Sequence, residues 1–278
     1  MIIKDIILET DKISYSYDTD KMALDSISLQ IHKGDKLAVL GSNGAGKSTC
    51  FLTLNGVLQP DEGKILYHGK EMTGKNLNEL RKNVGIVFQE ADSQIIASTV
   101  FQEISFGPMN LRLSKEEVKR RVLEAMESMS LTDLKDRPPH YLSGGEKKRV
   151  TIADILAMEP EIIIFDEPTA SLDPVNVEMF KGVLDKMAEL GKTLLISTHD
   201  VDFAFQWAER ALVFSHGKVI GEGPVEEIFQ NEELLREADL RKPIILEVYE
   251  SLVKYGIVEK GTCLPRDHRG IDELLGGR

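Results

Sequence analysis

The spacing of hydrophobic and polar residues predicts strands in the first and last thirds of the chain. Ile13, Tyr15 and Tyr17 alternate with polar residues, and residues 27–31 repeat this alternation, so both segments are expected to be half-buried strands. Four later runs are almost wholly apolar and are expected to be buried strands, at residues 36–40, 84–88, 162–165 and 193–197. Helix-like sequence follows most of them. We therefore expect an α/β fold with a parallel sheet, preceded by an N-terminal antiparallel β-subdomain.

The middle and the end of the chain have helical patterns. Residues from about 91 to 160 are expected to form a helical subdomain, in which Ser114 and Glu117 have the spacing of a capping box. This subdomain belongs to a main domain expected over residues 1–225. Residues 226–278 are expected to form a helical appendage ending in a polar, glycine-rich tail, which we expect to be disordered.

Composition and charge argue against several classes of protein. The chain has 278 residues, of which 46 are acidic and 34 basic, and its net charge is -12. A protein that binds duplex DNA usually has a basic face, so a nucleic-acid partner is not expected, and neither is adherence to anionic lipid by charge alone. No uncharged run approaches the roughly 20 apolar residues of a spanning helix. The first ten residues lack the basic flank and cleavage site of a signal peptide, so the protein is expected to stay in the cytosol.

The cysteines, histidines and basic clusters show no ligand-binding pattern. Cys50 and Cys263 are far apart and need no disulfide in the cytosol. The basic clusters at 119–121 and 147–149 are expected to be solvated helix faces rather than a binding patch. No metal-ligand spacing relates the histidines, which are His32, His68, His140, His199, His216 and His268.

A glycine-rich motif directly after the strand at 36–40 predicts a phosphate-binding loop. It fits G-x-x-x-x-G-K-[ST] and consists of Gly41, Ser42, Asn43, Gly44, Ala45, Gly46, Lys47, Ser48 and Thr49. The glycines let successive backbone N–H groups point at one anion, and the following helix adds its positive end. Lys47 would reach the β- and γ-phosphates of ATP, and the Ser48 hydroxyl would coordinate Mg²⁺. The motif therefore predicts a P-loop NTPase core.

Two acids end the apolar strand at 162–165. A buried parallel strand delivers such carboxylates to its C-terminal edge, where ligands of open α/β sheets bind. Asp166 would hold Mg²⁺, and Glu167 would polarise the water that attacks ATP. Strands often end in acids at solvent, so this pattern gains its meaning from the phosphate loop.

Between these two motifs lies Leu142 followed by Ser143, Gly144, Gly145 and Glu146. This stretch resembles the L-S-G-G-Q signature of the nucleotide-binding subunits of ABC transporters. The resemblance implies that the motif opens a helix and grasps the γ-phosphate of ATP held by a second subunit, which is an identical chain or a close relative. Physically, the motif is a second helix N-terminus prepared for an anion.

Other positions resemble further motifs of that family. Gln89 resembles the Q-loop glutamine, which approaches Mg²⁺ and senses the γ-phosphate. Asp173, in the sequence Ser171-Leu172-Asp173, resembles the D-loop that crosses to the partner subunit. His199 resembles the switch histidine that contacts the γ-phosphate.

Three positions need comment within this resemblance. Tyr17 is similar to the aromatic residue that stacks on adenine, and Tyr15, on the same strand face, is the alternative. Glu146 occupies a position where glutamine is usual, and Ser171 one where glycine or alanine is frequent. Neither change removes a group that ATP hydrolysis needs.

Softer motifs resemble one branch of the family. Residues 92–95, 103–108, 221–224 and 240–243 are similar to those of cobalt and nickel uptake ATPases, which belong to the energy-coupling-factor group. This resemblance implies a peripheral subunit on the cytoplasmic face of the cell membrane that powers metal uptake through integral membrane subunits. Vitamin uptake by the same kind of ATPase is the alternative.

A soluble ABC-type ATPase that does not take part in transport is a rival of another class. DNA-repair ATPases of this type insert long coiled coils between the phosphate loop and the acidic motif, and this chain has no heptad run there. Translation factors of this type carry two such domains in one chain. A kinase that uses the same loop would not need the signature.

Residues 91–108 are expected to contact the membrane partner. This segment follows Gln89 and is more apolar than a free surface loop, with Ile96, Val100, Ile104 and Phe106 among its members. The alternative is that these side chains only pack the helical subdomain.

Overall fold

Two β-sheets form the framework of the computed structural model, which describes residues 5–18, 21–170, 172–261 and 264–276. The antiparallel sheet has the order β2-β1-β4-β5 and consists of β1 (Ile6–Asp18), β2 (Lys21–His32), β4 (Glu62–Tyr67) and β5 (Lys70–Glu71). The second sheet has the order β10-β9-β3-β8-β7-β6 and consists of β3 (Lys36–Leu40), β6 (Val84–Val87), β7 (Ile162–Asp166), β8 (Thr193–Ser197), β9 (Arg210–Ser215) and β10 (Lys218–Pro224). It is parallel except for β10, which pairs antiparallel with β9. The expected α/β fold is confirmed.

The parallel strands are mostly apolar because both of their faces are buried. In β3, Leu37 and Val39 belong to a core shared with the antiparallel sheet. Ala38 and Leu40 belong instead to a core shared with the helices on the opposite face. Side chains alternate between the faces of a strand, so a strand buried on both sides favours apolar residues at successive positions.

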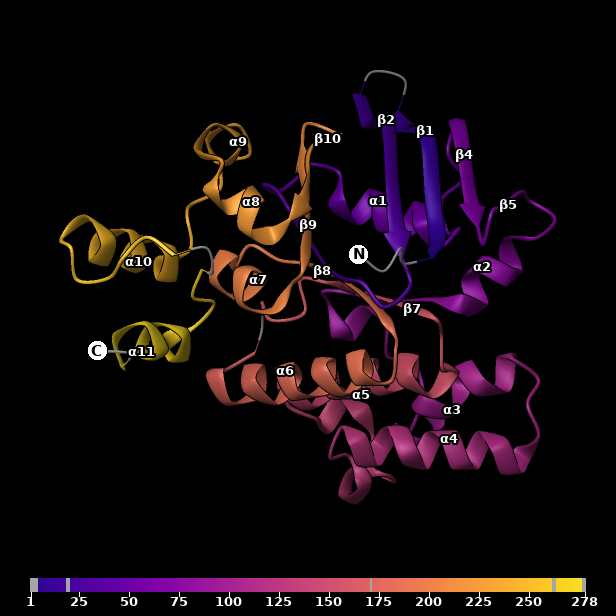
Figure 1. Ribbon diagram of the computed structural model, residues 1–278. Helices are drawn as coiled ribbons and strands as arrows, with labels where there is room; N and C mark the ends of the chain where they lie inside the picture. Colours follow the sequence, from indigo (N-terminus) through magenta and orange to yellow (C-terminus); the bar gives the residue numbers. More distant parts are fainter. Residues whose placement is uncertain (1–4, 19–20, 171, 262–263, 277–278) are drawn as a thin grey trace.

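Helices cover the parallel sheet and extend from it (Figure 1). On the side of the antiparallel sheet lie α1 (Lys47–Leu54) and α2 (Leu77–Asn83). The helices that lie between β6 and β9 in the sequence are α3 (Val100–Asn110), α4 (Lys115–Ser128), α5 (Gly144–Met158), α6 (Pro174–Glu189) and α7 (Val201–Trp207). Short 3₁₀ turns, at Ala91–Ser93, Thr132–Leu134 and Pro139–Tyr141, connect the helices of the middle segment.

The helical subdomain consists of α3, α4 and α5, which pack on one another below the sheet in Figure 1. Ser114 caps α4 by accepting the backbone N–H of Glu117, but the capping box is incomplete. The Glu117 carboxylate binds Arg120 and Arg121 instead, because these cations lie one turn further along the same helix face.

The prediction for the basic cluster at 147–149 was wrong. Lys148 is buried, and the neighbouring Lys147 and Arg149 are half-buried. This face of α5 lies against the segment after β6 rather than against solvent, a packing that no local charge pattern reveals.

The C-terminal region is helical, as expected, but its end differs from the prediction. Its helices are α8 (Val225–Gln230), α9 (Glu232–Glu237), α10 (Ile244–Lys254) and α11 (His268–Gly276). The expected disordered tail is therefore corrected, since α11 occupies most of it. Side chains of α8, α9 and α10 share the core of the main domain, and the boundary near residue 225 stays a prediction. No helix in the described ranges has the length and hydrophobicity needed to cross a bilayer.

Candidate functional site

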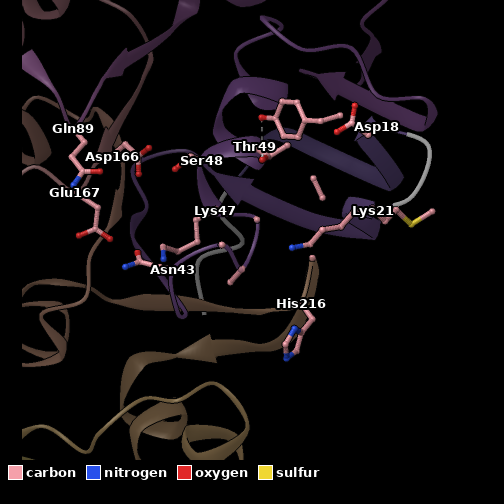
Figure 2. A pocket seen from close by; sticks show the side chains of 17 residues that line it. Asp18, Lys21, Asn43, Lys47, Ser48, Thr49, Gln89, Asp166, Glu167 and His216 are labelled. Carbon is pink, nitrogen blue, oxygen red and sulfur yellow. Dashed lines mark hydrogen bonds between the residues drawn. The ribbon is translucent and has the colours of Figure 1, made fainter. Parts of the chain in front are cut away.

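The phosphate loop joins β3 to α1 and lines a cavity of about 510 Å³ (Figure 2). Lys47 is the first residue of α1, and its ammonium donates hydrogen bonds to the carbonyls of Gly41 (2.7 Å) and Ser42 (3.1 Å). No side chain caps this helix, so its first-turn N–H groups remain available to an anion. Burial lowers the pKa of Lys47, and the carboxylates of Glu167 and Asp166 oppose that shift. The loop therefore presents a cation and open donors at one point.

Gly41→Ala is expected to destabilise the protein by about 2 kcal/mol or more. Gly41 has a φ of 138°, and a Cβ there would lie 2.3 Å from the backbone oxygen of Phe214. Gly44 provides a matched control: its φ is 77°, but a Cβ there meets nothing within 4 Å, so Gly44→Ala should cost only about 1 kcal/mol. Denaturant unfolding without nucleotide measures both. Equal losses would show that the close approach to Phe214 is unimportant.

Two carboxylates face the phosphate loop from the end of β7. Asp166 and Glu167 are each only 8% exposed. The buried Ser197 hydroxyl donates to Asp166 Oδ1 (2.6 Å) and accepts the backbone N–H of Glu167 (2.9 Å). His199 follows β8, and its Nε2 lies 2.8 Å from Glu167 Oε1. The predicted acids and the predicted switch histidine are thus adjacent.

The environment of Glu167 suits a group that handles a proton. Burial raises its pKa, while His199 and Lys47 lower it and Asp166 raises it further. Despite the short distance to His199, Glu167 Oε1 is a buried oxygen that accepts no well-aligned hydrogen bond among the described residues. An acceptor in that state can bind a water molecule and take a proton from it.

The cavity has two chemically different ends. Figure 2 shows Gln89, Asp166 and Glu167 on one side of the phosphate loop and Asp18 and Lys21 on the other. Tyr17, which precedes Asp18 in β1, also lines the cavity. Tyr17 is 59% exposed, and its hydroxyl lies 3.3 Å from Thr49 Oγ1. Tyr15 packs against the core and holds the Tyr17 ring edge-to-face at 5.1 Å. A nucleotide with its base at Tyr17 and its terminal phosphate at the acids fits this layout, which favours Tyr17 over Tyr15.

Several residues at the Tyr17 end were missed by the sequence interpretation. Asp18, Lys21, His216 and Gly217 also line the cavity. His216 and Gly217 form the turn between β9 and β10, and Gly217 accepts a backbone hydrogen bond from Asp25. The sequence indicates a turn there, but only the packing of the two sheets brings it to the nucleotide site.

The signature motif lies outside this cavity, at the N-terminus of α5. Ser143 caps the helix by accepting the backbone N–H of Glu146 (3.3 Å), and the Glu146 carboxylate accepts the N–H of Ser143 (2.7 Å). This reciprocal capping box explains how a glutamate fits where glutamine is usual. The hydrogen bond from the Ser143 backbone is the main reason why the pKa of Glu146 is lowered.

The D-loop aspartate lies beside the signature. Asp173 caps α6 by accepting the Asn176 backbone N–H (2.9 Å) and side-chain amide (2.7 Å), which lowers the Asp173 pKa. A Cβ on Gly145 would lie 3.2 Å from the same Asn176 amide, so the two helix N-termini adjoin. Gly144, like Gly145, lies in the first turn of α5. Ser171 lies outside the described residues.

The oxygen donors of the cavity fit Mg²⁺. Ser48, Gln89 and Asp166 supply hydroxyl, amide and carboxylate oxygens, the ligands that this ion prefers. Mg²⁺ is commonly held by one or two such groups together with substrate phosphates, and the cavity has that composition. Among the described residues no cluster of three histidine, cysteine or acidic side chains is arranged to hold a metal by itself.

Comparison with known proteins identifies the family. The family model described as ABC transporter matches residues 24–170, just over half of the chain. A "Putative ABC transporter ATP-binding protein" of Methanosarcina mazei is 50% identical over 254 residues, which cover 91% of this chain and 56% of the relative. The chain thus spans about half the length of that relative. The "Energy-coupling factor transporter ATP-binding protein EcfA" of Methanococcus maripaludis is 46% identical over 275 residues, which cover 98% and 99%.

Solved structures agree. CbiO1 from Clostridium perfringens, described as part of the ABC transporter complex cbiONQ, is similar with a TM-score of 0.75 and 41% identity over 89% of this chain and 100% of that one. The ATP-binding cassette MJ0796, solved as a dimer in a post-hydrolysis state with ADP and Pi, is similar with a TM-score of 0.71 and 28% identity over 79% and 99%. The chain therefore belongs to the ABC transporter family, among its energy-coupling-factor ATP-binding proteins.

Proposed function

We propose that the chain binds and hydrolyses MgATP as one half of a head-to-tail pair of ATPase subunits. One observation carries the proposal. Residues 43–49, Gln89, Asp166 and Glu167 line one cavity, whereas the signature residues 143–146 lie outside it on the same chain. A signature that contacts γ-phosphate must then act on nucleotide held by another subunit. The MJ0796 dimer supports such pairing.

Within one site, each residue has a role that its position suits. The phosphate loop and Lys47 bind the phosphates, and Tyr17 stacks on the base. Mg²⁺ bound with Ser48, Gln89 and Asp166 would neutralise charge on the phosphates. Glu167 takes a proton from the attacking water, and His199, 2.8 Å from it, contacts the γ-phosphate.

The partner completes that site from the opposite side. Ser143, with the open N–H groups of Gly144 and Gly145, donates to the γ-phosphate. Asp173, at the adjoining helix N-terminus, reaches toward the partner. Approach of the two chains would bury the phosphates of ATP between two helix N-termini, and hydrolysis would allow the two chains to separate.

The pair is proposed to power import through membrane-embedded subunits on the cytoplasmic face of the cell membrane. The similarity to EcfA and to a subunit of the cbiONQ complex supports this role. A transition metal ion, cobalt or nickel, is the proposed solute on the basis of the sequence resemblance, with a vitamin as the alternative. The solute would bind to the membrane subunits, since this chain needs no site for it.

Purification from native membranes tests the transport role. Tagged chain extracted in mild detergent should copurify with a protein that has several spanning segments. Vesicles containing that complex should take up cobalt or nickel only with internal ATP. Recovery of the chain from the soluble fraction alone, with full ATPase activity, would favour a role outside transport.

The structure divides residues 91–108 into two sets. Val100 and Ile104 are fully buried and pack the helical subdomain. Ile96 and Phe106 are 70% and 54% exposed, so they remain available to a membrane subunit. The coupling surface is therefore proposed to include only the outward-facing set.

Ile96→Glu and Phe106→Glu are expected to reduce ATP-dependent uptake at least tenfold and to leave basal hydrolysis by the isolated chain within about twofold. An apolar contact with a partner tolerates no buried unpaired charge, whereas an exposed side chain contributes little to the fold. Glu116→Gln, at an exposed position of α4, is a neutral control. Equal loss of uptake and basal hydrolysis would place the coupling surface elsewhere.

A further inference from the structure

Two successive lysines of the signature helix bind the segment that carries Gln89. Lys148 donates from its ammonium to the backbone carbonyls of Phe88 (2.6 Å) and Gln89 (3.2 Å). Lys147 forms an ion pair with Asp92, at 2.6 Å between Nζ and Oδ1. Both contacts join residues about 55 to 60 positions apart in the chain.

We propose that Lys147 and Lys148 are positioning residues that fix residues 88–92 to α5, so that Gln89 and Ser143 move together. Gln89 lines the nucleotide cavity of its own chain, and Ser143 would contact the nucleotide of the partner. The lysines would thus tie the two nucleotide sites of a pair to one another. The proposal rests on the proposed function only for the roles of Gln89 and Ser143.

Burial makes Lys148 the stronger of the two links. The residue is only 3% exposed, and a buried ammonium is costly unless several acceptors bind it. Burial lowers its pKa to about 8, and the carboxylates of Asp166 and Glu90 oppose the shift.

The geometry restrains the strand end that precedes Gln89. β6 ends at Val87, and the next two carbonyls leave the sheet and accept from Lys148. Beyond them, Asp92 lies in the 3₁₀ turn Ala91–Ser93 and is held by Lys147. The segment is therefore attached at two points. The hydrogen bonds from Lys148 are buried, whereas the ion pair with Lys147 lies near the surface, where the Asp92 side chain is 75% exposed. A rotation of the helical subdomain would have to carry it along.

Lys148→Met and Lys148→Gln test the buried link. Methionine keeps the length of the side chain without a donor, whereas glutamine keeps one N–H group for a carbonyl. Lys148→Met is expected to lower kcat by about tenfold or more with nucleotide affinity within about twofold, because the residue lies outside the cavity. Deuterium uptake by peptides covering residues 88–97 should rise while that of residues 36–54 stays constant. Lys148→Gln should recover part of both effects.

A double-mutant cycle separates positioning from general packing. If Lys148 acts through Gln89, then Lys148→Met added to Gln89→Ala should lower kcat by less than twofold further. The ion pair between Lys147 and Asp92 is tested by charge reversal. Lys147→Glu and Asp92→Lys should each raise the deuterium uptake of residues 88–97, and the double variant should restore slow exchange.

The proposal is overturned if Lys148→Met keeps the kcat of the native chain and the native deuterium exchange of residues 88–97. It is also overturned if the fold-loss in kcat of the double variant equals the product of the losses caused by Lys148→Met and Gln89→Ala alone. Failure of the proposed function would look different. The unaltered chain would then hydrolyse no ATP, while the exchange measurements would still report whether the lysines hold residues 88–92.

Discussion

Glu167→Gln should reduce the ATPase rate by a factor of about 10² to 10⁴, the range that a general base contributes. The substitution preserves the size of the side chain and removes only its ability to take a proton. The contacts that bind phosphate come from the loop and Lys47, so ATP affinity should stay within about twofold of the native value. Phosphate release measures turnover, and a fluorescent ATP analogue measures affinity. The variant should also elute as an ATP-dependent pair in size-exclusion chromatography.

Glu161→Gln is the matched control for this result. It makes the same change just before β7, at the end of the strand opposite Glu167, where the carboxylate accepts from Tyr67 (2.6 Å) and lies 2.8 Å from His68. Turnover of this control should stay near the native rate. Near-normal turnover of Glu167→Gln would show that another group takes the proton.

Lys47→Ala and Ser143→Arg should each abolish hydrolysis when present in both chains of a pair. The first removes the phosphate-binding charge of a chain's own site, and the second blocks the nucleotide of the partner. A mixed pair keeps one site made of two intact halves and has one site in which both halves are altered. Equimolar mixing should therefore restore about a quarter of the native rate, because half of the pairs are mixed and each keeps one site.

The mixture of the two variants can also be tested by ATP trapping, which does not require hydrolysis. With Glu167→Gln added to both chains, mixed pairs should trap about one ATP per pair, whereas pairs of either single kind should trap none. Complete failure to trap ATP in the mixture would mean that Lys47 and Ser143 do not serve the same nucleotide across the interface.

Some elements were predictable because local sequence alone determines them. The runs at 162–165 and 193–197 are buried on both faces, so nearly every position is apolar and the strands are evident without partners. The phosphate loop was predictable for a related reason, since backbone curvature requires glycines at fixed intervals, as Gly41 illustrates. Asp166 followed from the rule that parallel strands present ligands at their C-terminal edge.

Other features depend on which surfaces meet, and the sequence did not reveal them. Lys148 belongs to a basic cluster that resembles a solvated face, yet α5 packs that face against the segment after β6. Lys21 and His216 reach the cavity only because the antiparallel sheet lies beside the turn between β9 and β10. The helix at His268–Gly276 was mistaken for a tail because its glycines and charges outweigh its few apolar residues.

The central claim is that one chain's phosphate loop and another chain's signature enclose the same nucleotide, and cysteine cross-linking tests it most directly. One chain would carry Asn43→Cys and a differently tagged chain Ser143→Cys, both with Glu167→Gln and Cys263→Ser. The native Cys50 should not interfere, because it is 1% exposed and burial raises its pKa to about 12. The account predicts a disulfide between the two tagged chains that forms with ATP and not without it. Absence of that disulfide at saturating ATP would contradict the account, as would a disulfide within one chain of a third variant that carries both cysteines.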